Sequence, residues 1–467
     1  MAKSSYVLAG FETLTPIVDN FIKGKRGRWN NNFSRQQLAD FFTNEIAGLL
    51  HSYGQNFPGK KLFHKYNAAE AKVFQKSKEI EIFGDCPMVI DSGGFQISNG
   101  RMSELEAKML MKLYYEWIEE YPDLIQKAFI LDVPPGPGCR VFNSFDDVYK
   151  LNLESYIRAV SLPDELRKKI IYIHHFRTPK LWEIYTKIMH ENDMFCQFEY
   201  HGTGGIVANM ASDMVLPCIM YVLPIIPLIN EAKKCGRNYL NFHILGGANY
   251  RDIFFYELIK HVVWHYHKFT VNLSYDSSGI FKQVMYARYM YTMDGNGYMK
   301  KMDIRSFNLK NRFYDMPVQS DGATVEEMMQ RTIDDMCEQH GWKKINMDGV
   351  YDYERGTLHE DVKVYSMLRI LANYSRYEEF LRGIVQDLFP YYESGEKREF
   401  YERCTKITVR LNQGRATKKQ DVKTHSIFRS IDMLKNLDED YCKNVVDTYL
   451  QRDEFQNLDK RGKEWTI

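Results

Sequence analysis

The chain of 467 residues has room for one large domain and a smaller one, and its 44% hydrophobic and 26% charged residues are typical of a folded globular protein. Its 62 basic and 61 acidic side chains nearly cancel, which excludes a uniformly basic nucleic-acid-binding chain and restricts any such surface to local patches. The eight cysteines are scattered without a C-x-x-C pair, and the N-terminal residues lack an apolar signal-peptide core, so we expect reduced thiols in a cytoplasmic protein.

The N-terminal part of the chain predicts a strand, a basic loop and a helix. Residues 5–10 are typical of a buried strand, and apolar side chains at helical spacing predict a helix over residues 35–52. The loop between them is rich in glycine and carries one Trp, and such loops bind phosphates and stack bases. A solvated loop explains the same composition equally well. The basic residues that we consider as nucleic-acid ligands here are Lys23, Lys25, Arg26 and Arg28.

From residue 88 to residue 276, short apolar runs alternate with helical patterns, which predicts parallel βαβ units. One of these helices begins at Ser103, where Glu106 three residues later completes a capping box. Together with residues 5–10, the apolar runs make seven strands. The other six predicted strands cover residues 88–90, 128–131, 170–173, 195–200, 239–245 and 269–275.

We therefore predict an α/β fold in the form of a (β/α)8 TIM-like barrel, with an open doubly wound sheet as the alternative. The barrel needs an eighth strand, which we expect near Lys61–His64 or Ile219–Leu223. The most apolar stretch, residues 214–229, contains three prolines and is too short to span a bilayer, so no membrane association is expected.

After residue 300 the alternation stops and the pattern becomes mostly α-helical, with helices expected near 359–389, 396–410 and 426–450. We predict a TIM-barrel-like catalytic domain over residues 1–300 and a helical C-terminal domain over residues 301–467. Nucleic-acid binding and an ordinary solvated face are equal alternatives for the basic side chains of this tail. The tail residues that we consider as nucleic-acid ligands are Arg410, Arg415, Lys418 and Lys419.

Carboxylates follow three of the predicted strands, at Asp91, Asp132 and Asp276. A barrel of this kind builds its active site just after the carboxyl ends of its strands. One such carboxylate is more often a helix cap or an ion-pair partner, but three in one barrel favour catalysis. We expect the site to lie where these three side chains meet.

The most specific motif is Asp91-Ser92-Gly93-Gly94-Phe95-Gln96, directly after a buried strand. Glycines let backbone N–H groups approach a flat ligand, Phe95 offers a stacking face and Asp91 accepts a proton. The string resembles the signature of the tRNA-guanine transglycosylases and their DNA-modifying relatives, which exchange a guanine in a nucleic acid for a 7-deazaguanine. The resemblance covers about residues 85–280.

The resemblance implies that Asp91 is the general acid/base, that Asp276 is the nucleophile that forms a covalent ester with the sugar, and that Asp132 binds the guanine edge. It also implies that Phe95 and Leu245 hold the two faces of the base. His174-His175 stands where the family has a base-reading glutamine. The remaining base contacts implied in this way are Ser92, Gly93, Gly94, Gln96, His174, Gly204, Gly205 and Gly246.

Three departures indicate a divergent member, such as the viral and bacterial enzymes that put 7-deazaguanines into DNA. The base-reading residue differs, the helical tail is unfamiliar, and the family's C-x-C-x-x-C…H zinc site is missing, because Cys337 and His340 alone are too few ligands. We expect no zinc and no cofactor beyond a base co-substrate such as 7-cyano-7-deazaguanine.

DNA is the favoured polymer and tRNA the alternative, and a homodimer fits either. A catalytically silent base-binding subunit is the rival from another class, which has no need of both Asp91 and Asp276. If the protein is viral, the expected location is the host cytoplasm.

Overall fold

A computed structural model of the chain describes most of the predicted barrel and most of the helical tail. The described residues are 4–9, 11, 15, 18, 34–54, 81–135, 139–142, 144–175, 187, 191, 194–204, 215–248, 251–277, 289–293, 296–303, 330, 334–335, 337–343, 351–352, 357–358, 360–411 and 420–450.

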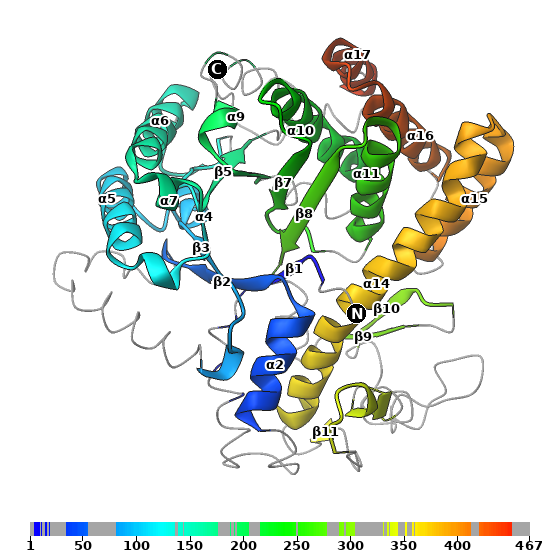
Figure 1. Ribbon diagram of the computed structural model, residues 1–467, viewed down its shortest axis with the longest axis horizontal. Coiled ribbons are helices and arrows are strands. Elements are labelled where there is room, and N and C mark those ends of the chain that lie inside the picture. Colours follow the sequence, from blue (N-terminus) through cyan, green and yellow to red (C-terminus); the bar gives the residue numbers. More distant parts are fainter. Residues whose placement is uncertain are drawn as a thin grey trace. The chain divides into compact units, whose positions relative to one another are not determined.

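Eight strands form one closed parallel barrel in sequence order, so the predicted TIM-like fold is confirmed (Figure 1). The pairing between β7 and β8 is the longest and joins residues 239–244 to residues 270–275 in register. Buried Val, Ile, Leu and Phe side chains occur in every strand except β6. The strands are β1 Tyr6–Ala9, β2 Gly48–Ser52, β3 Met88–Asp91, β4 Lys127–Phe129, β5 Ile170–His174, β6 Tyr200–Thr203, β7 Tyr239–Ile244 and β8 Thr270–Asp276.

The longer helices between β3 and β8 lie outside the strands to which they are connected (Figure 1). The capping box at the start of α5 is confirmed, because the Ser103 side chain accepts from the backbone N–H of Glu106 and the Glu106 carboxylate accepts from the backbone N–H of Ser103. The helices of the barrel are α2 Arg35–Glu45, α4 Gly94–Ser98, α5 Glu104–Glu120, η3 Pro122–Leu124, α6 Phe145–Ser161, α7 Asp164–Arg167, α9 Met194–Gln197, α10 Val215–Lys234 and α11 Asp252–His267.

The eighth strand was predicted in the wrong place. It is β2, formed by residues that we expected to continue the helix from residue 35. That helix ends at Glu45, since Ile46 is already extended with φ −123° and ψ 154°. The backbone N–H of Ala47 then donates to the carbonyl of Tyr6, and that of Tyr53 donates to the carbonyl of Asp91. Both hydrogen bonds satisfy groups that a continued helix would have paired internally.

Neither predicted location holds this strand. Residues 219–223 lie inside α10, which is buried on all sides over residues 221–229 and keeps Pro224 and Pro227 within it. A segment that is apolar all round forms a buried helix as readily as a buried strand. Residues 61–64 lie outside the described part of the chain.

β6 begins five residues later than predicted, after the short helix α9. As a result, His201 and Gly202 belong to the strand and not to the loop after it. The close approach of β7 requires glycine at 202, because a Cβ there would lie 2.8 Å from the carbonyl oxygen of His243. The shift changes which side chains of this segment face the barrel interior.

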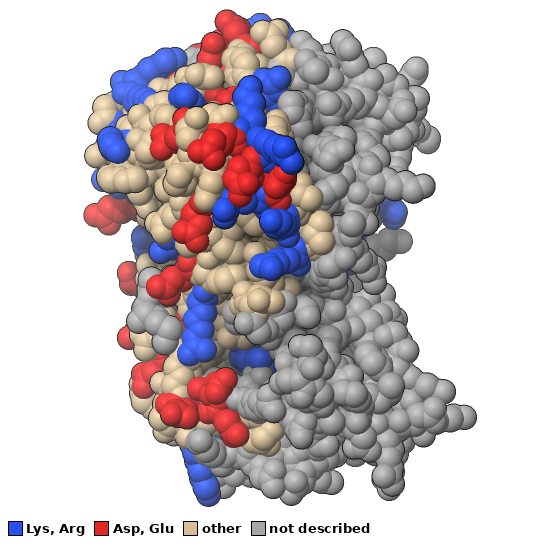
Figure 2. Space-filling model, turned by 90° about the vertical axis from the view of Figure 1, so that its right-hand side faces the viewer, with Lys and Arg blue, Asp and Glu red and all other residues tan. Residues whose placement is uncertain are grey.

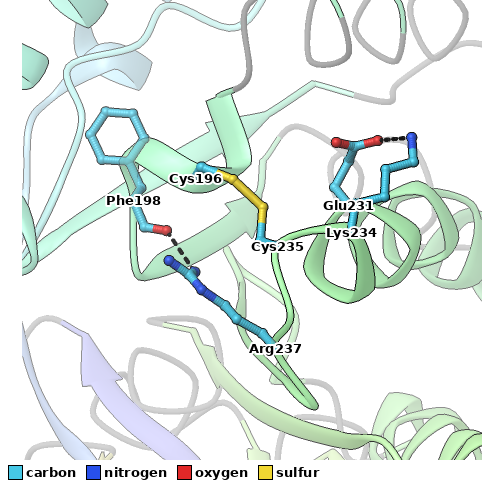
Figure 3. Close-up of a disulfide and its surroundings, with 6 residues drawn as sticks. All are labelled: Cys196, Phe198, Glu231, Lys234, Cys235 and Arg237. Carbon is cyan, nitrogen blue, oxygen red and sulfur yellow. Dashed lines mark hydrogen bonds and ion pairs between the residues drawn. A yellow bond between two sulfur atoms is a disulfide. The ribbon is translucent and has the colours of Figure 1, made fainter.

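Cys196 and Cys235 form a disulfide, so the expectation of reduced thiols is wrong for this pair (Figure 3). The two residues are 39 positions apart in sequence, but α9 and the end of α10 bring their Cα atoms to 6.6 Å. Arg237 strengthens the same junction by donating to the carbonyl of Phe198 at 3.2 Å. Sequence spacing does not reveal such a pair. Of the other cysteines in the described part of the chain, five are buried and form no disulfide, namely Cys86, Cys139, Cys337, Cys404 and Cys442.

The C-terminal extension is helical, as predicted, and consists of α14 Glu360–Glu393, α15 Lys397–Leu411, α16 Gln420–Asn436 and α17 Glu439–Leu450. α16 packs against α10 and α11, and the side chain of Asn230 donates to the carbonyl of Leu437 at 3.1 Å. Two short antiparallel hairpins precede these helices and had no recognisable pattern in the sequence. They are formed by β9 Tyr289–Met293 with β10 Met299–Asp303, and by β11 Tyr351–Asp352 with β12 Thr357–Leu358.

The chain divides into two compact units, each assembled from distant segments. Unit 1 contains residues 1–49, 72–87 and 277–380, and unit 2 contains residues 50–71, 88–276 and 381–467. The predicted division into domains at residue 300 stays a prediction. None of the described helices is long and apolar enough to cross a membrane.

Candidate active site

The three predicted carboxylates meet inside unit 2, at the carboxyl end of the barrel strands. The rings of Phe129 on β4 and His243 on β7 lie 5.0 Å apart, which identifies the inward face of both strands. Strand register places Asp91 on the same face as Phe129, and Ser274 and Asp276 on the same face as His243. All of these side chains therefore point into the barrel.

Asp91 is positioned at the end of β3 by a side chain on β2 and by the turn that follows β3. The Ser52 hydroxyl on β2 donates to Asp91 Oδ2 at 2.7 Å, and the backbone N–H of Gly93 is 3.4 Å from Oδ1. Burial raises the pKa of Asp91 to about 6, and the charges of Asp132 and Asp276 add to this increase, whereas the two hydrogen bonds oppose it. A carboxyl group with this pKa both donates and accepts a proton near neutral pH.

The glycines of the motif are required by packing. A Cβ at Gly94 would lie 1.5 Å from the backbone oxygen of Asp132, and one at Gly93 would lie 2.5 Å from the Cα of Gly54. Gly93 also has φ +98°, a conformation that side chains disfavour. The two glycines therefore bring the ends of β2, β3 and β4 together, which is a different role from the ligand approach that the sequence suggested.

The rest of the motif provides one exposed ring and two buried polar groups. The Phe95 side chain is 62% exposed at the start of α4, where a flat ligand can stack on it. Gln96 donates to Ser52 Oγ at 3.3 Å. Within the described part of the chain, Ser92 Oγ and Gln96 Oε1 are buried without a hydrogen-bond partner. Buried polar atoms without a partner are uncommon in folded proteins.

His175, and not His174, lies at Asp132. The Nε2 atom of His175 is 2.6 Å from Asp132 Oδ2, and the register of β5 puts His175 on the same inward face as Ile171. His174 faces the other way and lies against Tyr172, with its Nε2 3.1 Å from Nδ1 of His201. Burial and the neighbouring histidines hold the pKa of His174 well below its usual range. The structure therefore does not bring His174 to the three carboxylates.

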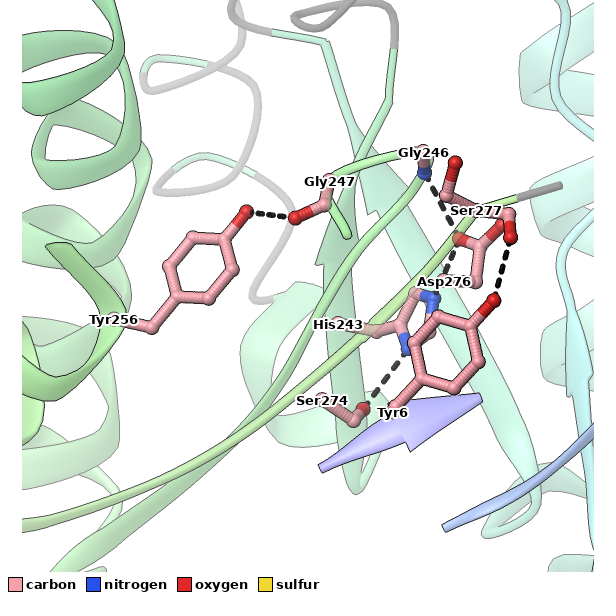
Figure 4. A network of polar contacts seen from close by, with 8 residues as sticks. All are labelled: Tyr6, His243, Gly246, Gly247, Tyr256, Ser274, Asp276 and Ser277. Carbon is pink, nitrogen blue, oxygen red and sulfur yellow. Dashed lines mark hydrogen bonds and ion pairs between the residues drawn. The ribbon is translucent and has the colours of Figure 1, made fainter. Parts of the chain in front are cut away.

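Asp276 is anchored through one of its oxygens (Figure 4). Oδ1 accepts from the backbone N–H of Gly246 at 2.9 Å and lies 3.1 Å from Nε2 of His243. Nδ1 of His243 is in turn 2.9 Å from the Ser274 hydroxyl. Sequence reasoning missed His243, although it is a polar residue on the inward-facing register of an apolar strand, and that signal identifies it once the register is known.

The loop after β7 carries Leu245 and Gly246 to the site. Leu245 donates its N–H to the carbonyl of Thr203, and its side chain lies 3.2 Å from where a Cβ on Gly204 would be. Gly246 has φ +74°, and this turn directs its N–H at Asp276. The hydroxyl of Tyr256 holds the next peptide by donating to the carbonyl of Gly247 at 2.6 Å (Figure 4). Gly204, Leu245 and Gly246 thus lie together beside Asp276.

Of the predicted nucleic-acid ligands, the structure describes Arg410, on α15. Among the residues that are coloured by charge in Figure 2, basic and acidic side chains are interspersed. On α15 itself Arg403 pairs with Glu399 at 2.8 Å and Arg398 with Glu402 at 3.1 Å. This arrangement is typical of a solvated helix face. The predicted site residues that lie outside the described part of the chain are Lys23, Lys25, Arg26, Arg28, Gly205, Arg415, Lys418 and Lys419.

The described residues contain no group of three or more His, Cys, Asp or Glu side chains that could hold a metal ion. Comparison of the chain with models of known protein families and with curated proteins found no match.

Proposed function

We propose that this protein is a pentosyltransferase of the guanine transglycosylase type, which exchanges a guanine in a nucleic acid for a 7-deazaguanine. The observation that carries the proposal is the presence of two carboxylates in one barrel interior, in environments that suit them to different tasks. Asp276 is anchored by two donors on one oxygen, and Asp91 has a raised pKa of about 6. Pairs of this kind support catalysis by a nucleophile and an acid/base.

The proposed reaction is a double displacement. Asp276 attacks C1′ of the nucleotide, the bond between C1′ and N9 of guanine breaks, and protonated Asp91 gives its proton to the departing base. The incoming 7-deazaguanine then returns a proton from N9 to Asp91, and its N9 attacks C1′ and releases Asp276. Asp91 ends the cycle protonated, as it began, and no further reactant is needed.

Other described side chains fit the binding of a flat, polar base. The exposed ring of Phe95 supplies a stacking face, and Asp132 with His175 supplies charged or hydrogen-bonding groups for a base edge. The target nucleotide has to leave its stack to reach Asp276 inside the barrel. We favour DNA over tRNA because the base-reading residue and the tail depart from the tRNA-modifying pattern and the zinc motif is missing.

Trapping of the covalent intermediate tests the proposal. The protein is incubated with labelled 7-deazaguanine and either duplex DNA or unmodified tRNA, and adducts are resolved on denaturing gels. Wild type is expected to form an adduct with DNA and to incorporate label. Asp276→Asn is expected to abolish both, and Asp91→Asn is expected to abolish incorporation. Asp123→Asn, a change at an exposed carboxylate, is the matched control and is expected to behave as wild type.

Three outcomes would redirect the proposal. Label that enters only tRNA would assign the enzyme to the tRNA-modifying class. If neither polymer incorporates label or forms an adduct, the catalytically silent subunit would be favoured. Normal exchange by Asp276→Asn would place the nucleophile elsewhere.

A further inference from the structure

The carboxylate of Asp276 is held asymmetrically. Both of its side-chain hydrogen-bond contacts fall on Oδ1, and no residue in the described part of the chain is hydrogen-bonded to Oδ2 (Figure 4). Asp276 is only 6% exposed, so its neighbours determine which oxygen faces the substrate. The two oxygens are therefore not equivalent.

The hydrogen bonds also define the tautomer of His243. An ionised carboxylate only accepts, so Nε2 of His243 has to carry the proton that faces Asp276. In the neutral imidazole, Nδ1 is then an acceptor, and the Ser274 hydroxyl at 2.9 Å donates to it. Ser274 thereby stabilises the tautomer that can donate to Asp276.

Strand register holds this triad rigidly in place. His243 on β7 is the direct partner of Ser274 on β8, and Asp276 follows on the same face two residues later. The imidazole is 3% exposed and lies against the ring of Phe129. Rotation of the imidazole would break both of its contacts at a position that is almost fully buried.

We propose that His243 is a positioning residue, which with Ser274 directs Oδ2 of Asp276 at C1′ of the nucleotide. The inference rests on the proposed function and adds to it a residue that the sequence motif does not contain. Because Oδ1 stays anchored as the ester carbonyl, the carboxylate returns to the same orientation when the sugar leaves. Ser274 acts only through His243, and this dependence makes the role measurable.

The first experiment determines the tautomer of His243 by NMR and does not depend on enzymatic activity. In protein labelled with ¹⁵N-histidine, the resonance of His243 is identified as the one that is lost in His243→Gln. Wild type is expected to show a protonated Nε2 and an unprotonated Nδ1, and Ser274→Ala is expected to show a mixture of tautomers. A protonated Nδ1 in wild type would overturn the proposed hydrogen-bond order.

The second experiment measures the single-turnover rate of adduct formation at saturating nucleic acid. His243→Leu is expected to lower this rate by about 100-fold, as is usual for loss of an orienting donor, with nucleic-acid affinity unchanged. His243→Gln, whose amide can still donate, is expected to recover part of the loss. Ser274→Ala is expected to cost about tenfold in the wild-type background and nothing further in His243→Leu.

The outcomes separate this inference from the proposed function. A wild-type rate in His243→Leu would refute the positioning role and leave Asp276 as the nucleophile. An equal effect of Ser274→Ala in wild type and in His243→Leu would also refute the positioning role and leave Asp276 as the nucleophile. No adduct in wild type with either polymer would refute the proposed function and the catalytic role of His243 together, even with the expected tautomer.

Discussion

Asp252, the first residue of α11, carries a buried carboxyl group. Burial raises its pKa from 3.8 to about 7, against the opposing effects of the Arg251 charge and a 3.1 Å hydrogen bond from the Tyr221 hydroxyl. Because the folded protein holds this proton more tightly than the unfolded chain, Asp252 stabilises the fold in full below pH 3.8. That stabilisation is lost as pH rises towards about 7.

Asp252→Asn removes this dependence and keeps an acceptor for Tyr221. A difference of about 3 pKa units corresponds to about 4 kcal/mol, of which roughly 2–3 kcal/mol falls between about pH 5 and about pH 8. The free energy of unfolding is measured by urea titration with circular dichroism. As the pH rises between these two values, the free energy of unfolding of wild type is therefore expected to fall by that amount relative to that of the variant. Other titrating groups are common to both proteins and cancel in the comparison.

The control is Asp146→Asn, at an exposed position on α6. Its unfolding free energy is expected to differ from wild type by the same small amount at both pH values. A difference between Asp252→Asn and wild type that does not change with pH would refute the reasoning, because it would mean that Asp252 is ionised in the folded protein at about pH 5.

Two further predictions concern the motif around Asp91. Since Asp91 has to begin the cycle protonated and its pKa is about 6, kcat/KM for the nucleic acid is expected to fall about tenfold for each pH unit above that value. Ser52→Ala removes a hydrogen bond that lowers this pKa, so it is expected to move the fall to higher pH, and an unmoved profile would mean that another group titrates. Gly94→Ala is expected to destabilise the fold by several kcal/mol (roughly 3 or more), because its Cβ would overlap the Asp132 carbonyl. Gly383→Ala, in an open position of α14, is the control and is expected to stabilise by about 0.5–1 kcal/mol in thermal unfolding.

The barrel was predictable from the sequence because most of its strands are short apolar runs that end in polar residues. β2 is the exception, for a specific reason. Leu49 continues the helical stripe of Leu38, Phe42 and Ile46, and the nearest glycine, Gly48, lies three residues beyond the end of the helix at Glu45 and already belongs to the strand. The helix ends there because β2 pairs with β1 and β3. This pairing joins segments that are distant in sequence, so local sequence patterns do not reveal it.

The site was predictable to the level of its carboxylates but not of their partners. Asp91, Asp132 and Asp276 follow directly after apolar runs. Their place at the ends of strands can therefore be predicted without knowing the register in which the strands pair. Which of His174 and His175 faces inward depends on a single-residue step, since neighbouring side chains of a strand point to opposite faces. His243 and Ser52 lie within strands, so their roles follow only from the pairing of β7 with β8 and of β2 with β3.

The geometry of Asp91 and of Asp132 is coupled through backbone and not only through charge. The carbonyl of Asp132 lies where a Cβ of residue 94 would be, so the turn after Asp91 and the segment after β4 move together. Asp132 also contributes to the raised pKa of Asp91, and that contribution weakens if the two segments separate. A larger residue at position 94 therefore lowers the pKa of Asp91 as well as the stability of the barrel. The glycine pair links the packing of this site to its acid/base chemistry.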